Sequence, residues 1–244
     1  DDARRAEAAA LAVAGVSQVQ SASAGYGRRA IHLAASNGFA GGYARTQRSI
    51  SCVAITGEGT AMERDWHAEG RTFHADLPDA DDIGRIAAER AVARAGARKP
   101  ATGAFPVLYD ERIAASLIGH LLSAINGTAV ARGASWLRDA MGADVLPAHL
   151  SLVEDPLRPR IGGSRPFDAE GLPASRRVLV EDGVLRSWVL DLATARKLGL
   201  QSTANAMRGT GAPPSPGTTN IALTPGNATR ADLLRDMGTG LLVT

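Results

Sequence analysis

The first hundred residues alternate between two spacings of apolar positions. Residues 1–14 and 79–98 repeat apolar residues at three- and four-residue intervals, which is typical of helices with one buried face. The later helix has its apolar stripe at Ile83, Ile86, Ala87, Ala91 and Val92. Between the helices, apolar and polar residues alternate in short segments that read as half-buried strands. These strands are expected at 30–35, 43–55 and 62–74.

The turn signals make this sheet antiparallel. Asn37-Gly38 favours a tight hairpin, because both residues tolerate the positive φ that such turns need. Within 50–55, Ile50, Cys52 and Ala54 share one face of the predicted strand. We therefore expect an antiparallel sheet with one face on a core and flanking helices at 1–14 and 79–98.

The pattern changes after residue 103. A short apolar strand at 105–109 precedes a helix at 111–125, and a second helix is expected near 135–141. Further on, a strand at 177–180 and its return at 185–190 flank Asp182-Gly183, another hairpin signal. A helix from Asp191 should end at Gly199, since glycine favours the left-handed helix cap.

These elements predict an α+β fold in two modules. The N-terminal α+β module spans 1–100, and Pro100 and Gly103 break the chain before a C-terminal β-rich α+β module at 104–244 with a mixed sheet. The first helix begins abruptly, and the run Leu241–Val243 has no evident strand partner. We expect the sequence to lack pieces at both ends; a naturally short chain is the alternative.

Composition narrows the class of protein. Apolar residues make up 45% of the chain and aromatic residues 4%, so the core is aliphatic. A net charge of +2 indicates neither direct nucleic-acid binding nor attraction to an anionic membrane. The single cysteine, Cys52, excludes an intrachain disulfide and is consistent with a reducing compartment. No apolar run approaches the ~20 residues of a membrane-spanning helix.

Several sequence blocks resemble one family. The blocks FDAEG at 167–171, VEDGVL at 180–185 and TARKLGLQST at 194–203 are similar to the TldD/PmbA family, the modulators of DNA gyrase. The similarity extends to 119–147 and 237–244, and it is greater to the PmbA (TldE) branch than to the TldD branch. Long blocks in the expected order are far more specific than one short motif.

The resemblance also implies where a metal motif should lie. Catalytic TldD-type members carry H-E-x-x-x-H at a helix start, and the matching positions here are Asp110 to Ala115. Glu111 matches the acid of that motif, but Asp110 and Ala115 replace its two histidines. His120 lies too far along the helix to restore the pair. The family's remaining ligand is expected beyond residue 244. The resemblance thus implies no metal in this chain and zinc in a TldD-type partner.

The other candidate residues are polar. Asp168 and Glu170 could act as an acid/base pair, or could hold turns and pair with Arg165 or Arg176. Polar loops around Asn205 and Asn220 could line a substrate groove or be ordinary surface. No catalytic or metal-binding residue is assigned to the chain. The candidate cleft residues are Glu111, His120, Arg165, Asp168, Glu170, Asn205 and Asn220.

Two classes of function remain open. The resemblance implies the metal-free subunit of a cytoplasmic two-subunit metalloprotease that acts on unfolded or small peptides, paired with a TldD-type subunit or with itself. In that case an extended peptide could add to a strand edge near 178–180 or 241–243. The alternative is a non-enzymatic, self-assembling binding protein, including the weaker possibility of a gyrase modulator.

Overall fold

The computed structural model describes residues 1–244 and divides them into two compact units. The first unit contains 1–31, 42–101 and 160–162. The second contains 32–41, 102–159 and 163–244, so the tip of the first hairpin groups with the second unit. None of the helices combines the length and the apolar composition that a membrane crossing requires.

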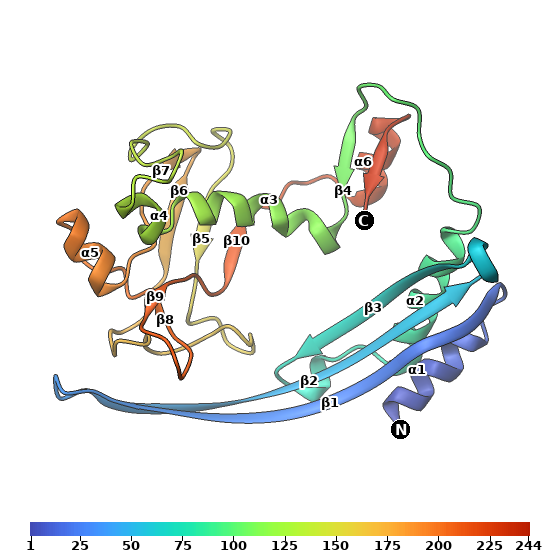
Figure 1. Ribbon diagram of the computed structural model, residues 1–244, viewed down its shortest axis with the longest axis horizontal. Coiled ribbons are helices and arrows are strands. Elements are labelled where there is room, and N and C mark those ends of the chain that lie inside the picture. Colours follow the sequence, from blue (N-terminus) through green and yellow to red (C-terminus); the bar gives the residue numbers. More distant parts are fainter. The chain divides into compact units, whose positions relative to one another are not determined.

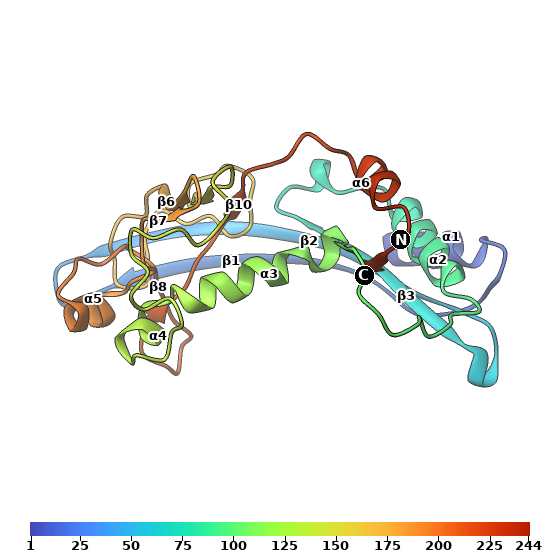
Figure 2. The same cartoon turned by 90° about the horizontal axis from the view of Figure 1, so that it is seen from above.

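The first unit is a three-stranded sheet with two helices on one face (Figures 1 and 2). Its strands lie in the order β1 (Val16–Ala34), β2 (Ala40–Thr56) and β3 (Glu63–Arg71). Its helices are α1 (Asp2–Leu11) and α2 (Ala80–Ala93). This arrangement confirms the predicted N-terminal antiparallel sheet with flanking helices, although β1 is much longer than the expected strand.

Small side chains hold the helices close to the sheet. Ile50, Cys52 and Ala54 are at most 3% exposed, and they share a core with alanines of α1 and α2, as the alternation predicts. Where the helices cross, a Cβ on Gly84 would lie 2.0 Å from the carbonyl oxygen of Ala6. Only glycine permits the two helix backbones to approach this closely. Small residues in α1 and α2 are therefore needed for close packing, as well as being typical of helices.

The second unit has three small sheets. A four-stranded antiparallel sheet has the order β10 (Ile221–Leu223), β5 (Leu152–Glu154), β6 (Arg177–Glu181) and β7 (Val184–Leu185). The parallel pair is β4 (Val107–Tyr109) with β11 (Leu241–Val243), and the antiparallel pair is β8 (Ala206–Met207) with β9 (Ser215–Pro216). Both kinds of pairing therefore occur in this β-rich unit.

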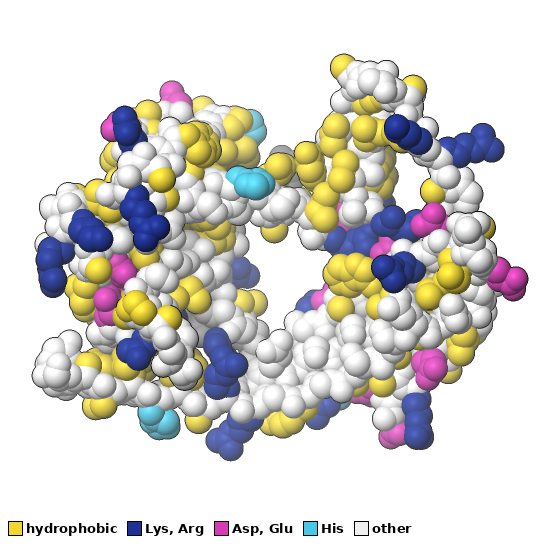
Figure 3. All heavy atoms as spheres, viewed as in Figure 1, with side chains coloured by type: hydrophobic (Ala, Val, Ile, Leu, Met, Phe, Trp, Pro, Cys, Tyr) yellow, Lys and Arg dark blue, Asp and Glu magenta, His cyan; other side chains and the backbone are white.

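Helices complete the second unit. They are α3 (Glu111–Ala124), α4 (Gly127–Ala131), α5 (Leu192–Leu198) and α6 (Arg230–Met237). The core joins the end of α3 to the main sheet through Ile125, Leu152, Leu179 and Trp188, all at most 5% exposed. Figure 3 shows apolar side chains (yellow) gathered over β4 and α6.

Two local predictions in this unit are wrong. Residues 135–141 form turns, and the helix lies earlier, at α4, where the Asn126 side chain caps it. Leu137 enters the core while Ser135 bonds to the carbonyl oxygen of Ala124, so tertiary contacts replace helical ones. The return strand is also shorter than expected. The chain leaves the sheet after Leu185, and Val189 bridges to Asn126.

In this unit the sequence predicted a hairpin turn correctly but missed a strand pairing between distant segments. Asp182 and Gly183 have φ values of 48° and 85°, as the predicted hairpin turn requires. By contrast, the expectation that Leu241–Val243 has no strand partner is wrong, because Leu241 pairs with Val107 in a parallel ladder. Parallel partners can lie far apart in sequence, so no local pattern reveals them.

Candidate functional site

The acidic loop at 163–172 is built around the Asp168 carboxylate, which is 1% exposed. Its Oδ1 accepts hydrogen bonds from the main-chain N–H groups of Glu170 and Leu172, both at 2.9 Å. Its Oδ2 accepts a third, from the N–H of Ala206 at 3.1 Å. One side chain thus fixes the loop and ties it to β8. An ionised carboxylate suits this role, since it accepts several bonds at once.

Glu170 holds the start of a helix. Its Oε2 accepts a hydrogen bond of 2.9 Å from the N–H of Leu192, the first residue of α5. Burial raises the pKa of this carboxyl, and the nearby charges of Asp191 and Asp168 add to the effect. The Leu192 bond works in the opposite direction. A carboxyl with a raised pKa can exchange protons closer to neutral pH, but this one is already engaged by the main chain.

Arg165 and Asn205 extend the same network. Arg165 donates to the carbonyl oxygen of Ala206 at 2.9 Å. Asn205, 2% exposed, donates to the Glu154 carboxylate at 2.8 Å, and this carboxylate also accepts from the N–H of Thr219 at 2.7 Å. Sequence reasoning missed Glu154. Its position at the end of a short apolar strand is the one signal that could have marked it.

Asn220 joins the loop to the main sheet. Its side chain donates to the carbonyl oxygen of Asp155 at 2.9 Å and to the Ser164 hydroxyl at 2.8 Å. Five of the seven candidate residues therefore belong to one hydrogen-bonded network. Their polar atoms bond mainly to the main chain and to each other, an arrangement that shapes a loop surface and gives no sign of an acid/base pair.

The two remaining candidates lie on α3. Glu111 is its first residue, and His120 follows nine residues later, about 13 Å along the axis at the usual rise. Both are exposed. The structure therefore separates them from one another along the helix, too far for both side chains to bind one metal ion.

Asp110 precedes α3 and has several partners. Its side chain is 8% exposed and accepts a hydrogen bond of 3.2 Å from the N–H of Arg112, capping the helix. The Nε atoms of Arg112 and Arg230 lie 3.4 and 3.7 Å from its two carboxylate oxygens. Asp110 thus holds the helix start and two guanidinium groups together.

Comparison with known proteins gives the family. Residues 1–95 match the model described as the PmbA/TldA metallopeptidase central domain, and residues 102–244 match that of the C-terminal domain. The chain belongs to the PmbA/TldD family. This confirms the resemblance inferred from the sequence blocks.

Individual members of the PmbA/TldD family are also similar to this chain in sequence. The chain is 36% identical over 210 residues to Metalloprotease PmbA of Escherichia coli O157:H7, covering 86% of this chain and 44% of the relative. It is 34% identical over 213 residues to the Metalloprotease PmbA homolog of Haemophilus influenzae, covering 86% and 45%. The chain thus spans less than half the length of these relatives.

Solved structures show the same fold. A candidate modulator of a DNA gyrase from Thermotoga maritima matches all of this chain and 55% of its own, with a TM-score of 0.89 and 25% identity. TldE from Thermococcus kodakarensis matches 98% of this chain and 54% of its own, with a TM-score of 0.85. At 21% identity, this second match shows the fold alone.

Membership of a metallopeptidase family raises the question of whether the residues at the start of α3 fit a zinc ion. They do not. Across all 244 residues, no group of three or more His, Cys, Asp or Glu side chains is placed to hold a metal. Near α3, the Asp110 carboxylate already faces two guanidinium groups, and Ala115 has no donor atom. A divalent cation would have to displace both arginines against charge repulsion.

Proposed function

We propose that this chain is part of a PmbA/TldE-type subunit that carries no catalytic metal and acts within a cytoplasmic metalloprotease complex. A TldD-type partner supplies the zinc, and the substrates are unfolded or small peptides. The observation that carries the proposal is Asp110, whose carboxylate is occupied by a helix cap and two arginines where catalytic members have a histidine. The PmbA metalloprotease names of the relatives support a role in proteolysis.

In this proposal the subunit shapes the cleft and holds the substrate. The network around Asp168 and Asn205 gives the loop surface a fixed form, since its polar groups are bonded within the fold. Of the two strand edges suggested by the sequence for peptide addition, β6 is excluded because it lies between β5 and β7. β11 pairs only with β4, so its other edge is the one that fits peptide addition.

The test is a reconstituted complex with a zinc-bearing TldD-type subunit and an unfolded peptide substrate. Glu111→Gln should leave cleavage within about threefold of normal, whereas removing a true general base costs on the order of a hundredfold or more. Glu111 is the suitable position because it is exposed at a helix start, while Asp168 variants would disturb the loop itself. Loss of turnover in Glu111→Gln, with assembly and peptide binding intact, would give this chain a catalytic role.

Zinc content provides a second readout. The purified chain should retain no zinc above background after dialysis at neutral pH, because its residues do not form a ligand set. Stoichiometric zinc would contradict the proposal. If the complex with the zinc-bearing partner cleaves no peptide and the chain assembles only with itself, the binding-protein alternative is favoured.

A further inference from the structure

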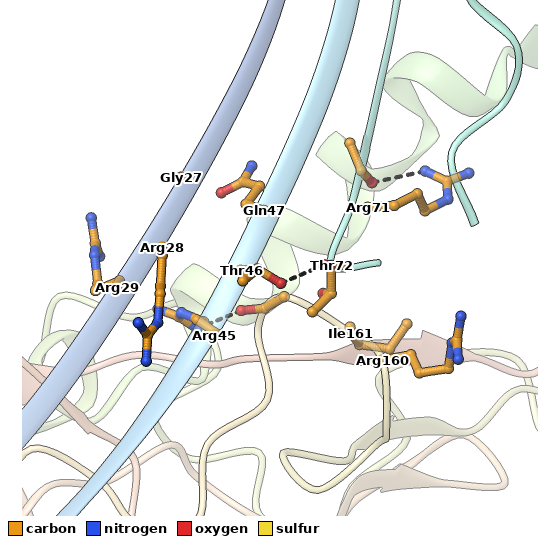
Figure 4. A pocket seen from close by; sticks show the side chains of 12 residues that line it. Gly27, Arg28, Arg29, Arg45, Thr46, Gln47, Arg71, Thr72, Arg160 and Ile161 are labelled. Carbon is orange, nitrogen blue, oxygen red and sulfur yellow. Dashed lines mark hydrogen bonds between the residues drawn. The ribbon is translucent and has the colours of Figure 1, made fainter. Parts of the chain in front are cut away.

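The first unit contains a cavity of about 550 Å³ with an unusual concentration of positive charge. Every residue that lines it belongs to this unit. Five of its twelve lining residues are arginines, drawn from β1, β2, the end of β3 and a loop at 160–162. These are Arg28, Arg29, Arg45, Arg71 and Arg160, shown in Figure 4. We refer to this cavity as the arginine pocket.

A step in the sheet creates the arginine pocket. β3 pairs with β2 only from Arg48 onward, where Arg48 lies opposite Arg71. The earlier residues of β2 continue without a β3 neighbour, and the pocket opens at this step. Thr46, just before it, donates to the carbonyl oxygen of Thr72 at 2.7 Å, which fixes the separation of the two strands (Figure 4).

The loop at 160–162 closes the pocket and is held at both ends. The Arg45 guanidinium donates to the carbonyl oxygen of Gly162. Arg160 binds both oxygens of Asp76, at 2.6 and 2.8 Å, and its guanidinium lies 4.3 Å from the centre of the Phe73 ring. Hydrogen bonds from Arg45 and Arg160 therefore hold the loop at 160–162 in place as one wall of the pocket.

Charge in the pocket is not balanced. Two arginines have a carboxylate partner: Arg71 with Glu69, and Arg160 with Asp76. Arg28 and Arg29 have no such partner, and Arg45 bonds to a carbonyl oxygen. Five arginines against two carboxylates leave a net charge of +3. Like charges confined to one cavity repel each other, and a bound anion relieves that repulsion.

We propose that the arginine pocket binds the carboxylate groups of an acidic peptide segment. A guanidinium group presents parallel N–H donors that match a carboxylate, and Arg160 shows this geometry on Asp76. A cavity of this size suits a few side chains of a peptide and is small for a nucleic-acid duplex. The choice of a peptide rests on the proposed function; the binding of an anion does not.

The carboxylates have two possible sources: Asp and Glu side chains, or the C-terminus of a peptide. Three fluorescent peptides of equal length separate them. The first carries four glutamates and an amidated C-terminus, the second carries glutamines with a free C-terminal carboxylate, and the third carries glutamines with an amide. Anisotropy titrations of the full chain at low salt should give at least tenfold tighter binding for the first or second than for the third. The tighter one identifies the source.

The pocket is tested with Arg28→Gln/Arg29→Gln, because neither side chain bonds within the fold and the variant should remain folded. Binding of the preferred peptide should weaken at least fivefold. The matched control is Arg4→Gln/Arg98→Gln, which removes the same charge from exposed arginines of the same unit outside the pocket. The control should change binding less than twofold, and 150 mM salt should weaken wild-type binding.

Three results would overturn the proposal. Equal losses in the pocket variant and the control would show general charge attraction. Equal binding of all three peptides would show that carboxylates are not recognised. Tighter binding of a single-stranded oligonucleotide with the same charge as the glutamate peptide would assign the pocket to nucleic acid. The binding assay needs neither a partner subunit nor cleavage, so a negative result here leaves the proposed function intact. Conversely, a chain that binds the peptide but supports no proteolysis contradicts the proposed function and leaves the pocket proposal intact.

Discussion

The acidic loop of the second unit and the arginine pocket of the first unit use their charges in opposite ways. Asp168 accepts hydrogen bonds from three main-chain N–H groups, and Glu170 accepts one from the start of α5. Arg28 and Arg29 line a cavity without a carboxylate partner. Charges bonded to their own fold stabilise it, while charges without a partner remain available to a ligand. Unused bonding capacity is therefore a better guide to a binding site than residue type.

The largest expected effect that tests this contrast is in the loop. Asp168→Asn should lower the free energy of unfolding of the second unit by about 3 kcal/mol, because an amide nitrogen cannot accept a bond and hydrogen bonds to charged groups are strong. Urea unfolding followed by tryptophan fluorescence measures the loss, in a background with Trp66→Phe and Trp136→Phe that leaves the buried Trp188 of this unit as the only tryptophan. Asp139→Asn is the matched control, since that carboxylate is 86% exposed. A loss below about 1 kcal/mol would leave Asp168 free for chemistry.

A smaller effect is expected in the pocket. Arg28→Gln/Arg29→Gln should change the free energy of unfolding by no more than about 0.5 kcal/mol, or raise it slightly by relieving repulsion. Urea unfolding of the first unit is the measurement. A decrease above about 2 kcal/mol would mean that these arginines hold the fold, and the contrast with the acidic loop would disappear.

The smallest effect depends on pH and concerns Glu170. Burial raises its pKa in the folded protein, so the folded state binds more protons than the unfolded state once the pH passes about 4.5, the ordinary value. The wild type should therefore lose stability as pH rises through the interval up to the raised pKa. In Glu170→Gln the amide oxygen can still accept the hydrogen bond from the Leu192 N–H. Because glutamine does not ionise, this variant does not lose stability as the pH rises through that interval.

The stability of Glu170→Gln relative to the wild type should thus grow as the pH rises above about 4.5, and then level off once Glu170 is ionised in the folded protein. The change should be a few tenths of a kcal/mol, because solvent screens this partly exposed carboxyl. Thermal unfolding across that pH range measures it. A difference that shrinks as pH rises would show that the fold favours the charged form of Glu170.

Local signals account for the parts of the fold that the sequence predicted. α3 begins after Asp110, whose side chain accepts from the helix start, and α5 lies between a capping box at Asp191 and the left-handed Gly199. The acidic loop was also visible, because Asp168 and Glu170 are close in sequence and the Asp168 side chain accepts hydrogen bonds from the nearby N–H groups of Glu170 and Leu172. In each case the chemistry and the structure lie within a few residues.

Features assembled from distant segments were not predictable in this way. β4 pairs with β11, more than a hundred residues away in the sequence. The segment at 135–141 has a helical pattern but forms turns, because contacts in the core replace helical hydrogen bonds. The arginine pocket draws Arg28, Arg45 and Arg160 from three separate places, and each alone reads as an ordinary surface residue. The pairing of β1 with β2 and the side-chain bonds of the loop at 160–162 bring them around one cavity.

The reactivity of Cys52 can report how often the core of the first unit opens. It is the only cysteine of the chain, it is fully buried in the core shared with α1 and α2, and burial raises the pKa of its thiol. Thiol reagents react with the thiolate, so the closed protein should be nearly inert to them. Alkylation then proceeds only through openings that separate the helices from the sheet, and its rate measures how often they occur. A cysteine introduced on the surface could accordingly carry a spectroscopic label without removal of the native one.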